Sequence, residues 1–159
     1  MPNLEQEVAS LLCLKKLTLG IVESASGGLI SHRITNIPGS SNYYKGSVIA
    51  YSNEIKIKLI GVLEETLNTY GAVSSQVVVE MAQGGRKILS ADICLADTGI
   101  AEPSGVTFGK PPGLFYIGLS HQVGTYSQQH NFHGNRGENK HSATEAALGW
   151  LKEYLKSLK

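Results

Sequence analysis

Two serines, a lysine and a tyrosine are spaced in this sequence so that they could support nucleophilic chemistry. Ser24 and Ser26 lie in the segment Glu-Ser-Ala-Ser-Gly-Gly, residues 23–28, which follows a short apolar run. Tyr51 and Lys56 follow a second apolar run. A serine hydroxyl can attack a carbonyl carbon when a lysine that has lost its proton through desolvation acts as the base. Lys56 is the candidate base, because it lies one turn into the helix predicted after Tyr51.

Each of these residues also has an ordinary structural explanation, which the sequence alone leaves open. The turn with Gly27 and Gly28 suits an anion at a helix N-terminus. It is equally typical of a plain strand–helix connection with Ser26 as the N-cap. Lys56 could be a solvated helix lysine, and Tyr51 could be a core aromatic residue with a satisfied hydroxyl.

A second basic pair follows another glycine-bearing turn near the end of the chain. Arg136 and Lys140 are four residues apart, so they could grip a phosphate or could simply lie on a surface helix. The five histidines lack a spacing to carboxylates or cysteines that is typical of metal ligands. We therefore predict neither a metal site nor a cofactor.

The hydrophobic pattern predicts the element order α-β-α-β-α-α-α-β-β-β-α. Strands separated by helices imply parallel crossovers, whereas the last two strands form a hairpin with antiparallel pairing. The predicted fold class is α/β: a three-layer α-β-α sandwich with a mixed, mainly parallel sheet. The predicted helices are 3–16, 27–36, 53–60, 63–70, 74–89 and 140–158, and the predicted strands are 17–22, 43–51, 91–96, 114–120 and 125–133.

The strand ends indicate where a ligand would bind. In open α/β sheets ligands lie at the carboxyl ends of the strands. This rule predicts that one region holds Ser24, the pair Ser52-Asn53 and Thr98. Residues 98–112 consist largely of turn-forming types, and a connection of that length is usually functional or mobile.

The composition is that of an ordinary globular protein, and we expect one domain over residues 1–159. Lys and Arg number 14 against 13 Asp and Glu, which argues against a nucleic-acid partner. No apolar run is long enough to span a membrane, and the N-terminus lacks the pattern of a signal peptide. Cys13 and Cys94 lie in apolar stretches, so we predict buried free thiols. A cytoplasmic enzyme or binding protein fits these features.

Several blocks of sequence occur in the order found in one known family. Residues 22–28, V-E-S-A-S-G-G, are similar to A-E-S-C-T-G-G, and residues 51–56 match Y-S-N-x-x-K. Residues 98–103, T-G-I-A-E-P, are similar to T-G-I-A-G-P, and residues 132–136, F-H-G-N-R, to F-x-G-D-R. On these blocks the chain resembles the nicotinamide-nucleotide amidase domain, also called the CinA C-terminal domain, over about residues 3–155.

The resemblance implies hydrolysis of the carboxamide of nicotinamide mononucleotide to nicotinate mononucleotide and ammonia, a step in pyridine-nucleotide recycling. It also implies a serine–lysine mechanism without a metal, with Ser24 as the nucleophile, Lys56 as its base and Tyr51 as a proton relay. Thr98 would contact the substrate or polarise the amide, and Arg136 would face the phosphate. The N–H groups after Ser24, at Gly27-Gly28, could form an oxyanion hole.

The family pocket is often completed across a homo-oligomer, so a homo-oligomer is expected, with neither a nucleic acid nor a membrane as partner. The chain would be the stand-alone form of the family, without an additional N-terminal domain. The expected substrate-binding residues are Ser26, Gly27, Gly28, Asn53, Thr98, Gly99, Arg136 and Lys140.

The sequence also departs from the family pattern around this site. Ala25 and Ser26 replace a cysteine and a threonine. Asp97 stands where the family usually has a small or hydroxyl residue, and Glu102 replaces a glycine. These changes keep two alternatives open: a weakened or repurposed relative that acts as a nucleotide-binding or interaction module, and an enzyme for a different amide or ester.

Overall fold

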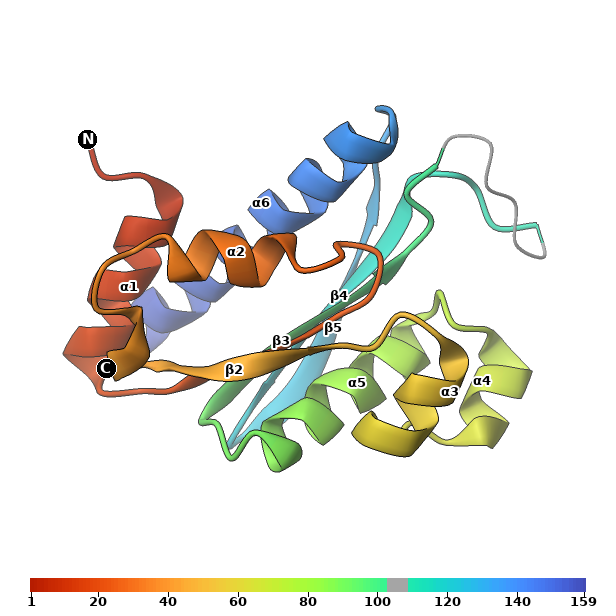
Figure 1. Cartoon of the computed structure of the whole chain (residues 1–159), viewed down its shortest axis with the longest axis horizontal. Coiled ribbons are helices and arrows are strands. Elements are labelled where there is room, and N and C mark those ends of the chain that lie inside the picture. Colours follow the sequence, from red (N-terminus) through yellow and green to blue (C-terminus); the bar gives the residue numbers. More distant parts are fainter. Residues whose placement is uncertain (103–108) are drawn as a thin grey trace.

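The computed structural model describes residues 1–102 and 109–159, which form three layers (Figure 1). Its elements, in chain order, are α1 (Leu4–Lys15), β1 (Leu19–Glu23), α2 (Leu29–Thr35), the 3₁₀ turn η1 (Ser40–Asn42), β2 (Tyr44–Ile49), α3 (Asn53–Ile55), the π-helical turn η2 (Lys56–Ile60), α4 (Glu64–Tyr70), α5 (Ser75–Ile88), β3 (Ile93–Gly99), β4 (Leu114–His121), β5 (Gly124–Asn131) and α6 (Arg136–Ser157).

The middle layer is a five-stranded sheet in the order β2-β1-β3-β4-β5. Strand β1 pairs in parallel with β2 and with β3, whereas β3–β4 and β4–β5 are antiparallel. The parallel pairs are the ones with helices between their strands, and the antiparallel hairpin is the one with a short turn. The predicted α/β class, mixed sheet and element order are confirmed, and the sheet is parallel on the side of β2, β1 and β3 and antiparallel in the rest, where a mainly parallel sheet was predicted.

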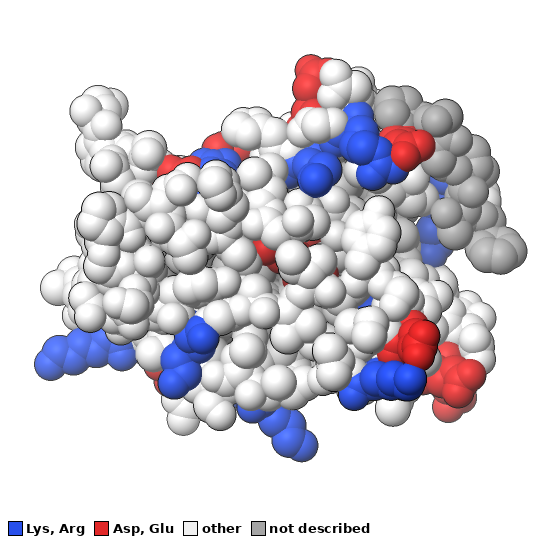
Figure 2. Space-filling view, viewed as in Figure 1, with Lys and Arg blue, Asp and Glu red and all other residues white. Residues whose placement is uncertain are grey.

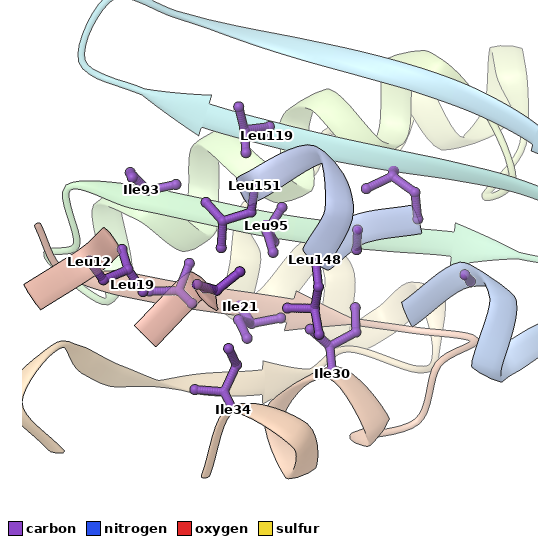
Figure 3. Packing of buried hydrophobic residues seen from close by; sticks show 14 of the residues in the cluster. Leu12, Leu19, Ile21, Ile30, Ile34, Ile93, Leu95, Leu119, Leu148 and Leu151 are labelled. Atoms are coloured by element: carbon purple, nitrogen blue, oxygen red, sulfur yellow. The ribbon is translucent and has the colours of Figure 1, made fainter. Parts of the chain in front are cut away.

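The two faces of the sheet are covered by different helices, as Figure 1 shows. Helices α1, α2 and α6 cover one face, where Ile21 and Leu95 pack with Leu148 and Leu151 (Figure 3). Helices α4 and α5 and the π turn η2 cover the other face, where Val22 belongs to the core. Neighbouring residues of a strand therefore enter different cores, as the two-residue period of a strand requires.

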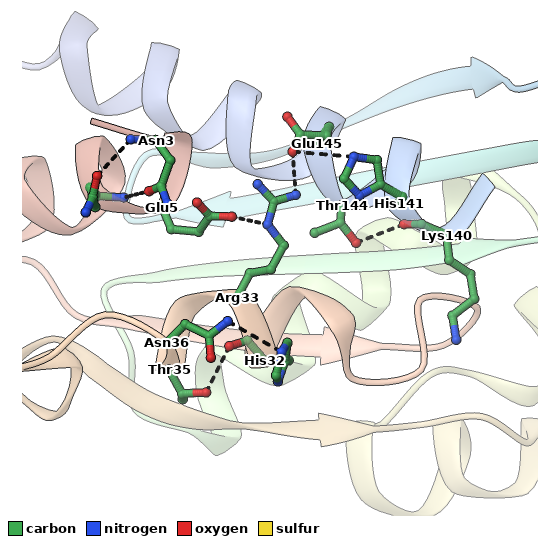
Figure 4. Close-up of polar contacts among 11 residues, drawn as sticks. Asn3, Glu5, His32, Arg33, Thr35, Asn36, Lys140, His141, Thr144 and Glu145 are labelled. Atoms are coloured by element: carbon green, nitrogen blue, oxygen red, sulfur yellow. Dashed lines mark hydrogen bonds and ion pairs between the residues drawn. The ribbon is translucent and has the colours of Figure 1, made fainter. Parts of the chain in front are cut away.

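Polar side chains fix the ends and the packing of the helices. The N-cap residues Asn3, Ser52 and Ser74 each accept a backbone N–H from the first turn of α1, α3 and α5, respectively. Arg33 of α2 forms ion pairs with Glu5 of α1 and Glu145 of α6, so it ties together the three helices of that face (Figure 4).

Three expectations were wrong at the level of single residues. Helix α6 begins at Arg136, four residues before the predicted start, because Asn135 and Glu138 form a capping box. The N-cap of α2 is Gly28, with a left-handed backbone, and not Ser26. Cys13 is exposed, although Cys94 is buried and both thiols are free.

The connection predicted for residues 98–112 begins later in the chain than expected. Strand β3 runs through Gly99, so Thr98 and Gly99 belong to the sheet. Residues 103–108 of the connection lie outside the described residues. Among the residues that the structure describes, no helix is both long and apolar enough to cross a membrane.

Helix α5 lies unusually close to the π turn η2, and a glycine permits this approach. A Cβ on Gly84 would lie 2.0 Å from the carbonyl oxygen of Ile60, the last residue of η2. No side chain can occupy that space without moving one of the two elements. Gly84 therefore sets the position of the turn that carries Lys56.

Replacing Gly84 by alanine tests this approach against a matched glycine in a helix. Gly84→Ala is expected to lower the free energy of unfolding by about 1–3 kcal/mol, because overpacking must displace η2. Gly149→Ala in α6, where a Cβ would meet nothing within 4 Å, is expected to be neutral or to stabilise by up to about 1 kcal/mol. Urea denaturation of both variants measures the difference, and equal effects would show that the approach is not tight.

Candidate active site

A cleft of about 330 Å³ opens at the carboxyl ends of β1, β2 and β3. The rule that ligands bind at the carboxyl ends of parallel strands thus identified the region correctly. Seven of the predicted site residues line this cleft: Ser24, Tyr51, Asn53, Lys56, Thr98, Gly99 and Arg136.

The floor of the cleft holds a serine and a lysine in contact. The Nζ atom of Lys56 lies 3.1 Å from the Oγ atom of Ser24. The same nitrogen donates hydrogen bonds to the carbonyl oxygens of Ala50, at 2.9 Å, and Tyr51, at 3.1 Å. A neutral amine has two N–H donors and one lone pair, so it can satisfy both carbonyls and still accept the proton of Ser24. The contacts suit a lysine that acts as a base.

The surroundings of Lys56 favour this neutral form. The side chain is only 1% exposed, and burial lowers its pKa to about 8 against the raising effect of Asp97. The alternative of a solvated helix lysine is thereby wrong for Lys56, whereas it holds for Lys58, which is exposed and pairs with Glu54. Lys56 opens the π turn η2, a type of turn found frequently at functional sites.

Tyr51 lies at the mouth of the cleft and is not a core residue. Its side chain is 63% exposed, and its backbone carbonyl is the group that accepts the hydrogen bond from Lys56. Within the described residues its hydroxyl touches neither Ser24 nor Lys56. A proton relay through Tyr51 therefore stays a prediction that the contacts do not support.

Thr98 and Lys110 hold one wall of the cleft in place. The hydroxyl of Thr98 donates to the carbonyl of Ala72 at 2.8 Å. The ammonium of Lys110 donates to the carbonyls of Tyr70, at 2.7 Å, and Val73, at 2.5 Å. Ala72 and Val73 line the cleft, so these bonds fix its shape. Because the Thr98 hydroxyl is engaged, its direct role in polarising an amide also stays a prediction.

The remaining predicted site residues do not face the cleft. Ser26, Gly27, Gly28 and Lys140 line a separate hollow beside it, together with His32 and Gly137. In Figure 4 the Lys140 side chain points away from the ion pairs of Arg33 and toward the turn before α2. A substrate-binding role of these four residues therefore stays a prediction, and they lie outside the cleft.

The amides of Gly27 and Gly28 are also engaged within the turn. Gly27 donates to the carbonyl of Ser24 at 3.0 Å, and Gly28 donates to the carboxylate of Glu23 at 3.1 Å. The oxyanion hole expected at these two amides is therefore not available. Ala25, which lines the cleft, is the residue of the turn 24–28 whose N–H has no acceptor among the described residues.

Two buried acidic residues organise the turn from beneath. Glu23 accepts backbone N–H groups from Gly28, Ile30 and Ser31 and so caps α2 in place of the predicted Ser26. Asp97 accepts the N–H groups of Ser24, at 3.1 Å, and Ser26, at 3.0 Å. Both carboxyls are 0% exposed, and burial raises the pKa of Asp97 to about 6.

Sequence reasoning treated Asp97 only as a departure from the family and gave Glu23 no role. A signal was present, because each acidic residue ends an apolar strand pattern, where a buried charge needs several partners. Glu23 and Asp97 come together beneath one turn because β1 and β3 are neighbours, and no local sequence pattern predicts that these strands are neighbours.

At the opposite wall of the cleft, Arg136 forms an ion pair with Glu102. Both side chains are about half exposed. Arg136 is the first residue of α6, and its guanidinium is the group that the sequence assigned to a phosphate. Figure 2 shows that acidic and basic side chains are interspersed on this face of the molecule, without a large area of one sign.

The comparisons with known proteins agree with this architecture. The family model described as the CinA C-terminal domain matches residues 1–155. The chain belongs to the CinA C-terminal domain family. In the structure, no three His, Cys, Asp or Glu side chains of this domain's described residues come close enough to hold a metal ion together.

Relatives of this CinA domain are longer proteins. A protein of Halothermothrix orenii, named for competence-damage induction, is 49% identical over 97% of the chain and 38% of its own length. A CinA-like protein of Geotalea uraniireducens is 43% identical over 99% of the chain and 37% of its own length. The chain thus spans less than two fifths of the curated relatives that it matches.

Solved structures of the CinA superfamily share the whole fold. A CinA superfamily protein from Klebsiella pneumoniae has a TM-score of 0.95 at 28% identity and covers 98% of this chain and 97% of its own. The competence/damage inducible protein CihA from Agrobacterium tumefaciens has a TM-score of 0.90 at 31% identity, with 99% and 98% coverage. The described fold is therefore that of the family.

The buried carboxyl of Asp97 should make the stability of the CinA domain depend on pH. Its pKa rises from 3.8 to about 6 on folding, so the stability that it contributes is present below pH 4 and is lost as the pH rises through 6. The wild type is expected to lose on the order of 3 kcal/mol over this range, which Asp97→Asn would not lose.

Urea denaturation at steps from pH 4 to pH 7 measures this difference. Asp92→Asn, the same substitution at the exposed amino end of β3, is the control and should keep the wild-type slope. If the wild type and Asp97→Asn lose stability in parallel, the titrating group is not Asp97.

Proposed function

We propose that the chain hydrolyses the carboxamide of nicotinamide mononucleotide to nicotinate mononucleotide and ammonia, with Ser24 as nucleophile and Lys56 as base. The single observation that carries the proposal is the contact between Ser24 Oγ and the buried Lys56 Nζ at 3.1 Å, on the floor of a cleft. The chain belongs to the CinA C-terminal domain family, and the resemblance to this family implies amidase activity. Both points support the choice of reaction.

The first half of the reaction would form an ester on the enzyme. Ser24 Oγ attacks the carboxamide carbon as its proton passes to Lys56 Nζ, and the carbonyl electrons move to the oxygen. When the tetrahedral intermediate collapses, the C–N bond breaks and Lys56 returns the proton to the departing nitrogen, which leaves as ammonia. A covalent step is useful because an amide is a poor electrophile.

The second half would release the carboxylate. Water attacks the ester carbon and gives its proton to Lys56, and the bond to Ser24 Oγ breaks as the serine regains a proton. In both halves the oxyanion would accept the N–H of Ala25, the amide directly after the nucleophile, in place of the Gly27 and Gly28 amides. The cleft needs no metal for these steps.

The substrate phosphate would lie against Arg136 at the mouth of the cleft. A guanidinium suits this task because its fork can bind two phosphate oxygens. Glu102 already pairs with this guanidinium, however, so a phosphate must displace the carboxylate or lie beside it. This pair favours a second candidate function, the hydrolysis of a carboxamide that carries no phosphate.

Ammonia release from nicotinamide mononucleotide tests the reaction and the two catalytic residues. Ser24→Ala and Lys56→Ala are each expected to lower kcat by about a thousandfold or more, because nucleophile and base act as a unit. Lys58→Ala is the matched control, since this lysine lies two residues from Lys56 but is exposed.

Three outcomes would contradict the proposal in different places. Absence of turnover by the wild type rejects this substrate. Full turnover by Ser24→Ala rejects the nucleophile, and an equal loss in Lys56→Ala and Lys58→Ala rejects the specific role of the buried lysine.

Glu102→Gln tests whether the ion pair sets the choice of substrate. Removing the carboxylate frees Arg136, so the KM for nicotinamide mononucleotide should fall roughly three- to tenfold with kcat unchanged. Nicotinamide riboside, which lacks the phosphate, is the control substrate, and its KM should not change. A parallel fall for both substrates would show that Glu102 acts on the shape of the cleft and not on the phosphate.

A further inference from the structure

The hydroxyl of Ser26 lies between two buried carboxyl groups beneath the nucleophile turn. Its Oγ atom is 2.6 Å from Oε1 of Glu23 and also contacts Oδ1 of Asp97. Ser26 itself is 0% exposed. The three residues form what we call the carboxyl pair cluster: Glu23, Ser26 and Asp97.

A count of hydrogens shows that this cluster holds one extra proton. A serine hydroxyl has a single hydrogen, and an ionised carboxylate can only accept. If both acids were ionised, one of the two contacts of Ser26 Oγ would place oxygen lone pairs against each other without a hydrogen. In the arrangement observed, one carboxyl group must therefore donate to Ser26 while Ser26 donates to the other.

The pattern of donors places this proton on Asp97. Both oxygens of Glu23 are already occupied: Oε1 accepts from Gly28 and Ile30, and Oε2 accepts from the amide and the hydroxyl of Ser31. A proton on either oxygen would collide with one of these donors. Among the described residues, Asp97 accepts two backbone N–H groups, one on each oxygen, so its Oδ1 has room to donate to Ser26 Oγ.

The charge on Asp97 matters because of what lies around it. Asp97 accepts the amide N–H of Ser24, so a negative charge there would oppose an oxyanion forming at the next amide, Ala25. A negative Asp97 also raises the pKa of Lys56 and so favours its inactive ammonium. A neutral Asp97 would remove both effects.

Few other titratable groups face Asp97 from the elements packed around it. Glu23 approaches from β1 and Lys56 from η2. From α6, Lys140 reaches only the outer side of the turn, 3.3 Å from where a Cβ of Gly27 would be. The paired residue on β4 is the apolar Ile117.

We propose that Asp97 is a positioning residue of the amidase, and that in the reactive form it is protonated and donates to Ser26 while Lys56 is neutral. The inference rests on the proposed function for its link to catalysis, but the location of the proton can be measured without turnover. In this reactive form the pair of Asp97 and Lys56 holds one proton in total. The protonated Asp97 keeps the turn of Ser24 fixed through three hydrogen bonds.

The pH profile of turnover tests the role of this proton. The wild type should show a bell-shaped kcat/KM, with limbs near the pKa values of about 6 for Asp97 and about 8 for Lys56, because the one-proton pair exists between them. Asp97→Asn stays neutral at every pH, and its amide can still donate to Ser26. This variant should retain activity within about tenfold of the wild-type maximum and lose the alkaline limb.

Asp92→Asn, the same substitution at the exposed residue just before β3, is the control and should keep the bell-shaped profile. The proposal is overturned if Asp97→Asn keeps the alkaline limb. It is equally overturned if this variant loses more activity than stated at every pH, because catalysis would then need an ionised Asp97.

Infrared spectroscopy locates the proton directly. The wild type should lose the C=O stretching band of a protonated carboxyl group with a midpoint near pH 6, well above ordinary surface carboxyls. The band should be absent in Asp97→Asn and present in Asp92→Asn. In Ser26→Ala, which serves as a second variant if Asp97→Asn fails to fold, the midpoint should move to lower pH, because the protonated Asp97 loses the acceptor of its hydrogen bond.

The two experiments separate this inference from the proposed function. A wild type that releases no ammonia rejects the amidase, while the infrared titration still decides where the proton lies. A band that persists in Asp97→Asn, or no carboxyl group that titrates near pH 6 in the wild type, rejects the protonated Asp97 even if ammonia is released.

Discussion

Burial of the Lys56 amine is the constraint on which the site depends. An ammonium without water needs acceptors, and the structure supplies the carbonyls of Ala50 and Tyr51 at the end of β2. The π turn η2 brings the lysine back over that strand end, and Gly84 lets η2 pack closely enough on α5. The burial that lowers the pKa of Lys56 also brings its amine into contact with Ser24, so the packing of Lys56 and its proposed role as a base have one cause.

The turn that carries Ser24 is held by a second buried polar group, of opposite sign. Glu23 and Asp97 together accept five of the eight backbone amides of residues 24–31, in this turn and in the first residues of α2. Such a network fixes the backbone because each unsatisfied amide would carry a desolvation penalty. Among the described residues, it also leaves the N–H of Ala25, next to Ser24, without an acceptor, and Ala25 lines the cleft.

Much of the architecture could be predicted because it follows from local signals. The hydrophobic pattern along the chain predicted the element order, and the strand-end rule predicted the region of the cleft. The errors have physical reasons. Ser26 satisfies the local pattern of an N-cap, but Glu23 accepts the amides at the start of the helix instead. A carboxylate is the stronger acceptor at the positive end of a helix.

By itself, the sequence identified the candidate residues for the proposed chemistry: a serine in a glycine-bearing turn, a lysine one turn past a strand, and an arginine near the last helix. Only the tertiary structure decided which of them meet. Ser24 and Lys56 are 32 positions apart, and their contact requires β1 and β2 to be parallel neighbours. The same holds for Asp97 and Ser26, because β3 pairs with β1 from the other side. Side-chain type and local spacing are written in the chain, whereas burial, and with it the charge of a lysine or an aspartate, arises only when distant strands pack together.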